Sequence, residues 1–211
     1  MKIIAVLNEK GGVGKTTIAT NLSRGLQLMG HRTLLVDSDP QGSARDWHAA
    51  AQDGSTLPPV VGMDRPSLFK NLKQVAQDFD WTVIDGSPRV EELAVASIKI
   101  ADFVLIPVQP SPYDIWAAES LVDLVKTRRE IAEGKPGAGL LISRQIVGTK
   151  LAGEARAALE GYQLPILSSL TSQRVIYAQS ASRGSTVLDD EPNGAAAEEI
   201  RAVIKEIVSW S

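Results

Sequence analysis

Blocks of apolar and polar residues alternate along the whole chain. Short apolar runs, typical of strands buried on both faces, are followed by longer stretches in which apolar residues recur every three or four positions, as in helices. The short runs predict strands over Ile3–Leu7, Arg32–Asp37, Trp81–Asp85, Phe103–Val108, Gly139–Ser143 and Pro165–Leu167. Leu57–Met63 is either a further short strand or a loop. Such alternation predicts an α/β fold: a mostly parallel, twisted sheet with helices on both faces.

The stretches with helical spacing lie between these strands. They predict helices over Thr16–Met29, Ser43–Ala51, Ser67–Asp78, Glu91–Ala101, Ile115–Glu133, Leu151–Glu160, Val175–Ser182 and Gly194–Trp210. We expect the third of these helices to bury Leu68, Leu72, Val75 and Phe79. We expect the last to bury Ile200, Val203, Ile204, Ile207 and Val208. Since neither a repeat nor a linker interrupts the pattern, the 211 residues are expected to form one domain, residues 1–211.

The composition excludes several classes of protein. Cysteine is absent, which rules out disulfides, thiolate metal sites and iron–sulfur clusters. The first residues enter a strand and no apolar run reaches membrane-spanning length, so we expect a cytoplasmic protein without a signal peptide. The net charge of −3 gives no overall basic character, and contact with nucleic acid would require a local basic patch.

The most specific motif follows the first predicted strand. Residues 9–17 read Glu-Lys-Gly-Gly-Val-Gly-Lys-Thr-Thr. This is close to the phosphate loop G-x-x-x-x-G-K-[ST], whose glycines let backbone N–H groups surround a polyphosphate. Lys15 would reach the β- and γ-phosphates, and the Thr16 hydroxyl would bind Mg²⁺. Glu9 replaces the first glycine of the motif, and Lys10 adds a second lysine.

Acidic residues end the next two strands of the predicted sheet. Ligands of parallel sheets bind beyond the carboxyl ends of the strands, so these residues are expected near the phosphate loop. Asp85 has the form of a Walker B aspartate, which orients the water shell of Mg²⁺. Asp37 and Asp39 are candidates for holding the water that attacks the γ-phosphate. Each could instead be a turn or helix-cap residue, which aspartate favours.

Three motifs, in this order, resemble those of the ParA-type ATPases, a group that includes MinD. They are the deviant phosphate loop Lys10–Thr17, the segment Asp37–Gly42, and Asp85 with Pro88. Val104–Ser111 also resembles a family segment, so the likeness covers nearly the whole chain. The resemblance implies a P-loop NTPase with weak intrinsic ATPase activity, which binds ATP and Mg²⁺ and forms an ATP-sandwich homodimer.

The resemblance also implies a role for each matching residue. The nucleotide would be bound by Lys10, Gly11, Gly12, Val13, Gly14, Lys15, Thr16 and Thr17. The metal would be bound by Thr16, Asp37 and Asp85. In catalysis, Lys10 would cross to the partner's nucleotide as an arginine finger does, Lys15 would hold the phosphates, and Asp39 would orient the water.

The chain departs from the family pattern at two places. Ser143-Arg144-Gln145 stands where many relatives have an asparagine that reads the adenine, which leaves the contacts to the base open. Asp85-Gly86-Ser87-Pro88 differs from the commoner Asp-x-Pro-Pro. No guanine-reading Asn-Lys-x-Asp is present, and adenine is inferred from the resemblance.

The partners follow from the same resemblance. The ATP-bound dimer would bind DNA without sequence preference, associate with the nucleoid, and segregate plasmid or chromosome DNA with a ParB-like centromere-binding protein that stimulates hydrolysis. The first strand begins near residue 2, as in the small ParA subgroup that lacks an N-terminal DNA-binding domain. Contacts to DNA phosphates need lysines and arginines. The candidates are Lys150, Arg156, Arg174, Arg183, Arg201 and Lys205.

Other functions on this fold remain to be weighed. A MinD-like membrane-cycling ATPase would need a basic amphipathic C-terminal helix, but Glu198, Glu199 and Glu206 outnumber Arg201 and Lys205 in the last helix, which favours core packing. An ATPase of the nitrogenase iron-protein type is excluded by the lack of cysteine. A phosphotransfer or ligase enzyme would need a substrate pocket that no residues identify. Within the ParA group, the cargo could also be a protein assembly.

Overall fold

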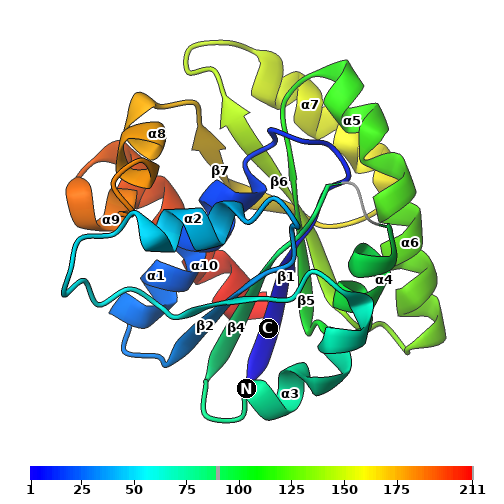
Figure 1. Ribbon diagram of the computed structural model, residues 1–211. Coiled ribbons are helices and arrows are strands. Elements are labelled where there is room, and N and C mark those ends of the chain that lie inside the picture. The colour runs from blue at the N-terminus through cyan, green and yellow to red at the C-terminus, as the bar shows by residue number, and fades with distance from the viewer. Residues whose placement is uncertain (89–90, 211) are drawn as a thin grey trace.

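The computed structural model describes residues 1–88 and 91–210, and its centre is a seven-stranded sheet (Figure 1). The strands are β1 Lys2–Val6, β2 Thr33–Asp37, β3 Val60–Gly62, β4 Trp81–Asp85, β5 Phe103–Val108, β6 Gly137–Gln145 and β7 Ile166–Ser172. They lie in the order β3-β2-β4-β1-β5-β6-β7, and every pair of neighbours is parallel. The expected α/β class and parallel sheet are confirmed.

Helices cover both faces of this sheet. They are α1 Lys15–Leu28, α2 Ser43–Ala49, α3 Leu72–Val75, α4 Glu91–Ile100, α5 Pro112–Ala117, α6 Glu119–Ile131, α7 Leu151–Leu159, α8 Val175–Ala181, α9 Val187–Asp190 and α10 Ala195–Trp210, with 3-10 turns at Pro66–Asn71 and Glu160–Tyr162. Strand β1 shows how the core divides, because Ile3 and Ala5 pack on one face while Ile4 and Val6 pack on the other. None of the helices in the described ranges is long and apolar enough to cross a bilayer.

The helix expected over Ser67–Asp78 is wrong in type and in its buried face. A 3-10 helix over Pro66–Asn71 runs directly into the short α3. Phe69 and Leu72 are buried, whereas Leu68 and Val75 are 38% and 49% exposed. A 3-10 helix turns once every three residues, so Phe69 and Leu72 share a face that the α-helical spacing did not predict.

The single helix expected over Ile115–Glu133 is two helices, α5 and α6, which meet at Ala118. The first begins earlier than expected, because the Ser111 hydroxyl caps it by accepting the N–H of Asp114 (3.3 Å) and Pro112 fits the first helical position. Strands β6 and β7 are longer than expected, and α9 was missed. The early start of α5 matters because it brings Asp114 to the phosphate loop.

The last helix, α10, packs in the core. Its residues Ile200, Val203, Ile204 and Ile207 are all buried, and Val208 is partly buried. It lies against α1, where Gly25 contacts Ile204 so closely that a side chain at position 25 would overlap it. The interpretation of this apolar face as core packing is confirmed, and the face is therefore not available to a lipid surface.

Candidate functional site

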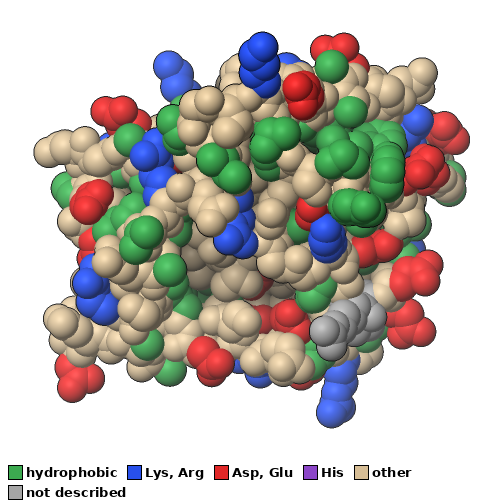
Figure 2. Space-filling view, turned by 90° about the horizontal axis from the view of Figure 1, so that it is seen from above, with side chains coloured by type: hydrophobic (Ala, Val, Ile, Leu, Met, Phe, Trp, Pro, Cys, Tyr) green, Lys and Arg blue, Asp and Glu red, His purple; other side chains and the backbone are tan. Residues whose placement is uncertain are grey.

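The carboxyl ends of β1, β2 and β4 meet at one edge of the sheet. Asp85 is the register partner of Val6 in β1 and of Asp37 in β2. The loop that follows β1 therefore lies beside both acidic strand ends, as the sequence predicted. Figure 2 looks down on this edge and shows basic and acidic side chains around it, with a group of hydrophobic side chains on the side where α5 lies. In α5 itself, Tyr113 and Trp116 are 74% and 64% exposed.

The loop between β1 and α1 has the geometry of an anion site. Gly12 and Gly14 have φ values of +78° and +94°, which only glycine adopts readily. Helix α1 starts immediately after Gly14, and no side chain caps its first turn. The unpaired N–H groups of that turn, together with the helix dipole, favour a bound phosphate. A Cβ added at Gly11 or Gly12 would meet nothing within 4 Å, so the surface above the loop is open.

Lys15 lies under this loop with its amino group turned inward. The residue is buried, and Nζ donates a 2.8 Å hydrogen bond to the carbonyl oxygen of Lys10. Burial lowers the pKa of the Lys15 ammonium, while the carboxylates of Asp85 and Asp39 oppose that shift. Because an ammonium group has three donors and one is used here, Lys15 can bind phosphate oxygens after a small rotation.

Asp85 is a buried carboxylate with no complete hydrogen bond to the described residues, although the Thr16 hydroxyl lies near it. Neither carboxylate oxygen has a hydrogen-bond partner among the described residues. Burial raises the pKa of Asp85 to about 7 and nearby Asp37 adds to the shift, whereas the Thr16 hydroxyl and Lys15 act in the opposite direction. A buried carboxylate left without donors is costly unless a cation compensates it. Hard oxygen ligands suit Mg²⁺, so Asp85 and the Thr16 hydroxyl fit this metal.

Both carboxylate oxygens of Asp37, in contrast, accept hydrogen bonds from the segment that follows it. One carboxylate oxygen accepts the N–H of Asp39 (3.1 Å), and the other accepts the N–H and the Nε of Arg45 (3.0 and 3.3 Å). Asp37 therefore organises the segment Asp37–Gly42 in this state. Its expected role toward Mg²⁺ stays a prediction.

Asp39 is half-buried at the start of the same loop. Its Oδ1 accepts the N–H of Gln41 (3.0 Å), and its charge acts on the pKa of both Lys15 and Asp85. The structure thus brings Asp39 close to the lysine and the carboxylate of the site, where a residue that orients water would be needed. That catalytic role also stays a prediction.

Lys10, the additional lysine of the loop, points toward α5. Its Nζ lies 2.8 Å from Oδ2 of Asp114. The neighbouring Glu9 accepts a 2.7 Å hydrogen bond from the Ser120 hydroxyl in α6. The two residues in which the loop departs from the common motif are therefore both bound by the segment that follows β5.

Comparisons with known proteins agree with this geometry. Residues 1–56 and 55–135 match the family model described as an AAA domain. The chain is 32% identical over 208 residues to "Maintenance of carboxysome distribution protein A" of Halothiobacillus neapolitanus, which covers 97% of this chain and 95% of that protein. It is 28% identical over 239 residues to "Chromosome-partitioning ATPase Soj" of Thermus thermophilus, with 98% and 95% covered.

This chain belongs to the ParA/MinD family of P-loop ATPases. The fold is also that of the ATP complex of a Cyanothece McdA variant, with a TM-score of 0.80 at 19% identity over 100% of this chain and 97% of that one. As a member of this family the protein is an ATPase.

The ATPase also holds its phosphate loop from the side of β5 and β6. The carbonyl oxygen of Gly12 accepts hydrogen bonds from Nε2 of Gln109 (2.8 Å) and Nη1 of Arg144 (2.6 Å). The Ser143 hydroxyl donates to the carbonyl oxygen of Val13 (2.9 Å). These three contacts to the loop were not expected from the sequence. Gln109 and Ser143 follow or end strands of the predicted sheet, and that placement is the one signal that could have identified them.

A cavity of about 220 Å³ opens beside Gly14 and Thr17. It is lined in part by Arg144, Arg174 and Tyr177. Burial raises the pKa of Tyr177 well above its usual value, and the carboxylate of Glu199 adds to this shift, so the hydroxyl keeps its proton. The cavity continues directly from the phosphate loop and the first turn of α1.

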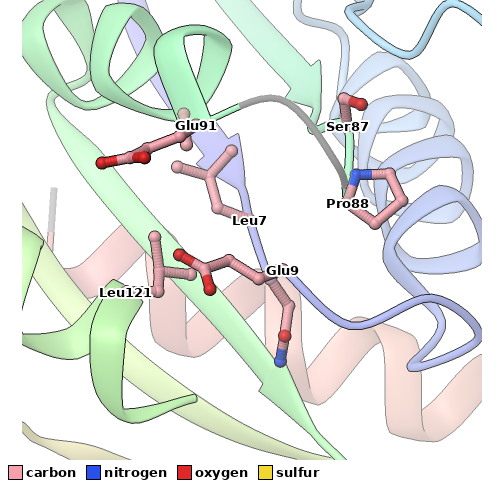
Figure 3. A pocket seen from close by; sticks show the side chains of 8 residues that line it. Leu7, Glu9, Ser87, Pro88, Glu91 and Leu121 are labelled. Atoms are coloured by element: carbon pink, nitrogen blue, oxygen red, sulfur yellow. The ribbon is translucent and has the colours of Figure 1, made fainter. Parts of the chain in front are cut away.

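A second cavity, of about 180 Å³, lies on the other side of β1 (Figure 3). The side chains of Glu9 and Glu91 both point toward this space, and Leu7 and Leu121 form its apolar walls. Two carboxylates would repel a triphosphate. This cavity is therefore not part of the phosphate site, although it borders the same loop.

The basic residues expected to contact DNA lie in different surroundings. Lys150 is exposed before α7, whereas Arg156 donates to the carbonyl oxygen of Leu167 (2.6 Å). Arg174 and Arg183 form ion pairs with Glu199 (2.7 Å) and Asp190 (2.6 Å). The structure brings two of the candidates together, because one groove on α10 is bordered by Arg201 and Lys205. A DNA-binding face made of these residues stays a prediction.

Proposed function

We propose that this ATPase positions a large protein assembly inside the cell, by cycling between an ATP-bound homodimer on DNA and a released form. The observation that carries the proposal is the 32% identity, over 97% of the chain, with a protein named for carboxysome distribution. The second candidate cargo is plasmid or chromosome DNA with a ParB-like partner. It is favoured by the 28% identity with a chromosome-partitioning ATPase.

The chemistry follows from the side chains at the sheet edge. On nucleotide binding, Lys15 exchanges its bond to the Lys10 carbonyl for the β- and γ-phosphates. Thr16 and Asp85 are the residues that would hold Mg²⁺, which when bound supplies positive charge to the phosphate oxygens. Asp39 orients the water for attack on the γ-phosphate.

The dimer is required because the Lys10 ammonium is directed away from its own phosphate loop in this geometry. Its ammonium is bound to α5, and its side chain is 38% exposed at the open edge of the sheet. From there it is free to reach the nucleotide of a second copy placed face to face with the first. A lysine supplied in this way would neutralise transition-state charge as an arginine finger does.

The first test separates the two lysines. Lys15→Ala should lose ATP binding, measured by calorimetry. Lys10→Ala should bind ATP with near-normal affinity but lose partner-stimulated turnover by about 1,000-fold, the effect of removing an arginine finger. Lys70→Ala, at an exposed lysine of the 3-10 segment, is the control and should behave as wild type. Wild-type turnover in Lys10→Ala would contradict the shared site.

The second test identifies the cargo. The product of the adjoining reading frame is purified, and ATP turnover is measured with it, with and without a random-sequence DNA duplex. We expect DNA and this protein together to stimulate turnover, and the protein to bind an assembly rather than a DNA site. Specific binding to a DNA site would make the cargo DNA. ATP-dependent binding to anionic liposomes and not to DNA would favour a MinD-like cycle and overturn the proposal.

A further inference from the structure

The contact between Lys10 and Asp114 links the phosphate loop to the first turn of α5. Lys10 Nζ lies 2.8 Å from Asp114 Oδ2, and the side chains are 38% and 7% exposed. The carboxylate is therefore buried while the lysine that neutralises it remains at the surface. An ion pair of this kind is asymmetric, because the lysine can leave for water or another anion and the carboxylate cannot.

Helix capping does not account for Asp114. Ser111 and Asp114 have the spacing of a capping box, in which the acidic side chain accepts the N–H of the capping residue. Here the Ser111 N–H donates to the carbonyl oxygen of Gln109 (2.8 Å) instead. The Asp114 carboxylate accepts the Ser111 hydroxyl (2.5 Å) and Lys10, and its Oδ1 is buried without a partner in the described part of the chain. Lys10 is thus the cation that compensates this buried charge.

We propose that Asp114 is a positioning residue that keeps Lys10 folded back in the monomer. The ion pair between them must break when the dimer forms on ATP, and the cost of breaking it opposes dimerisation. The inference rests on the proposed role of Lys10 at the nucleotide of the second copy. It adds a resting position for Lys10 and the residue that maintains it.

The cost of separating Lys10 from Asp114 is electrostatic. A buried carboxylate that loses its only cation is strongly destabilised. Lys10 therefore leaves Asp114 when it gains a stronger interaction elsewhere, and the triphosphate of a second copy carries more negative charge than one carboxylate. A diphosphate offers less charge at that place. The latch made by Lys10 and Asp114 consequently favours dimerisation on ATP over dimerisation on ADP.

The protomer's own nucleotide also acts on the latch. In this state the Lys10 carbonyl accepts the Lys15 ammonium (2.8 Å), and the Lys10 N–H donates to Oδ1 of Asn8 (2.9 Å). When Lys15 turns to a phosphate, Lys10 loses one of the two bonds that fix its backbone. Filling a protomer's own site thereby loosens the residue that must reach the other site.

The main experiment compares Asp114→Asn with wild type in ATP-dependent dimerisation, measured by analytical ultracentrifugation. The amide keeps the shape of the side chain but no longer binds the ammonium as an ion pair. We expect the concentration needed for half-dimerisation with ATP to fall by about tenfold, which lies within the usual range of coupling between sites. The matched control is Asp80→Asn, which breaks the exposed Arg32–Asp80 pair (3.1 Å, 65% and 42% exposed) and should change nothing.

A second measurement reads the position of Lys10 directly and does not depend on dimerisation. Brief labelling with acetic anhydride, followed by peptide mass spectrometry, should modify Lys10 several-fold faster in Asp114→Asn than in wild type. Labelling of the exposed Lys70 should be equal in both proteins. Ser111→Ala removes the hydroxyl that binds Asp114 without removing the charge, so it provides a second variant if Asp114→Asn folds poorly. The buried carboxylate then depends more strongly on Lys10, and Lys10 labelling should be slower than in wild type.

The double variant decides whether the effect passes through Lys10. Asp114→Asn should have no effect on dimerisation when Lys10 is already alanine. Stronger dimerisation of Asp114→Asn in the Lys10→Ala background, or weaker dimerisation of Asp114→Asn alone, would overturn the latch. Full stimulated turnover in Lys10→Ala alone would instead refute the proposed function, so the two failures are distinguishable.

Discussion

Two carboxylates in this molecule, the half-exposed Glu206 and the buried Asp85, have opposite surroundings. At the seam between β7 and α10, Glu206 accepts four hydrogen bonds from the N–H and hydroxyl groups of Ser168 and Ser169 (2.7–3.0 Å). Burial raises the pKa of Glu206, but these donors outweigh it and leave the pKa below its usual value. At the sheet edge, Asp85 has no complete hydrogen bond within the described part of the chain, and burial raises its pKa to about 7 despite the nearby Thr16 hydroxyl.

The difference lies in the donors rather than in burial alone. A carboxylate surrounded by donors has its hydrogen bonds satisfied without any ligand, and it holds two elements together. A buried carboxylate without donors destabilises the folded protein until a cation binds to it. The comparison therefore separates structural acidic residues from those that await a ligand. Three measurements test this distinction.

The largest effect is expected from Asp85→Asn. Without the carboxylate, Mg²⁺-dependent ATP turnover should fall by about 100-fold or more, the loss typical of damage to a metal site. The nucleotide-free protein should become more stable at pH 8, by on the order of 2 kcal/mol, because a buried unpaired charge is removed. Steady-state kinetics and thermal unfolding measure the two effects.

Asp78→Asn changes an exposed aspartate in the same way and should alter neither quantity. Loss of stability in Asp85→Asn at pH 8 would show that Asp85 has a structural partner after all, and the contrast with Glu206 would disappear.

Glu206→Ala should lower stability and leave turnover nearly unchanged, the opposite of Asp85→Asn. It leaves the N–H and hydroxyl groups of Ser168 and Ser169 without their acceptor, at a cost of about 1–3 kcal/mol in the free energy of unfolding. Turnover per folded molecule should stay within about twofold of wild type, because the seam does not touch the phosphate loop. Urea unfolding measures the free energy of unfolding, and active-site titration with kinetics measures the turnover per folded molecule. A large loss of turnover in fully folded Glu206→Ala would refute the structural assignment.

The smallest effect concerns pH. The pKa of Asp85 is raised from 3.8 to about 7 in the folded protein, so the native state binds the proton more tightly than the unfolded chain does. Stability of the nucleotide-free protein should accordingly fall as the pH rises from about 4 to about 7. Mg²⁺ requires the ionised carboxylate, and its affinity should weaken about tenfold for each pH unit below 7.

Calorimetry of Mg²⁺–ADP binding at pH 6, 7 and 8 measures this dependence. The same titrations with Asp85→Asn correct for protonation of the nucleotide itself. A pH dependence that survives in Asp85→Asn would show that another group is responsible.

The sequence predicted the parts of the site that are local in the chain. The apolar runs located β1, β2 and β4, and parallel pairing then required Asp37 and Asp85 to lie beside the phosphate loop. The strength of these predictions comes from short-range patterns, namely buried strands and a glycine-rich loop before a helix.

The contacts that fix the side-chain positions of Lys10 and Lys15 could not be predicted in this way. Lys10 and Asp114 are far apart in the sequence, and their meeting depends on where α5 begins and on the break at Ala118. The capping-box spacing of Ser111 and Asp114 could have placed the start of α5 correctly. It carries no information on which residue would neutralise the aspartate.

The packing of α1 against α10 has a consequence for folding during synthesis. The helix that carries Lys15 emerges early from the ribosome, but its Gly25 surface is covered by Ile204, and Asn21 accepts the N–H of Val187 (3.1 Å). Domains complete their cores as units, so α1 gains this packing only when α10 has been synthesised. A chain cut short before α10 would carry the whole nucleotide motif on an incompletely packed helix, and we expect it to bind ATP weakly.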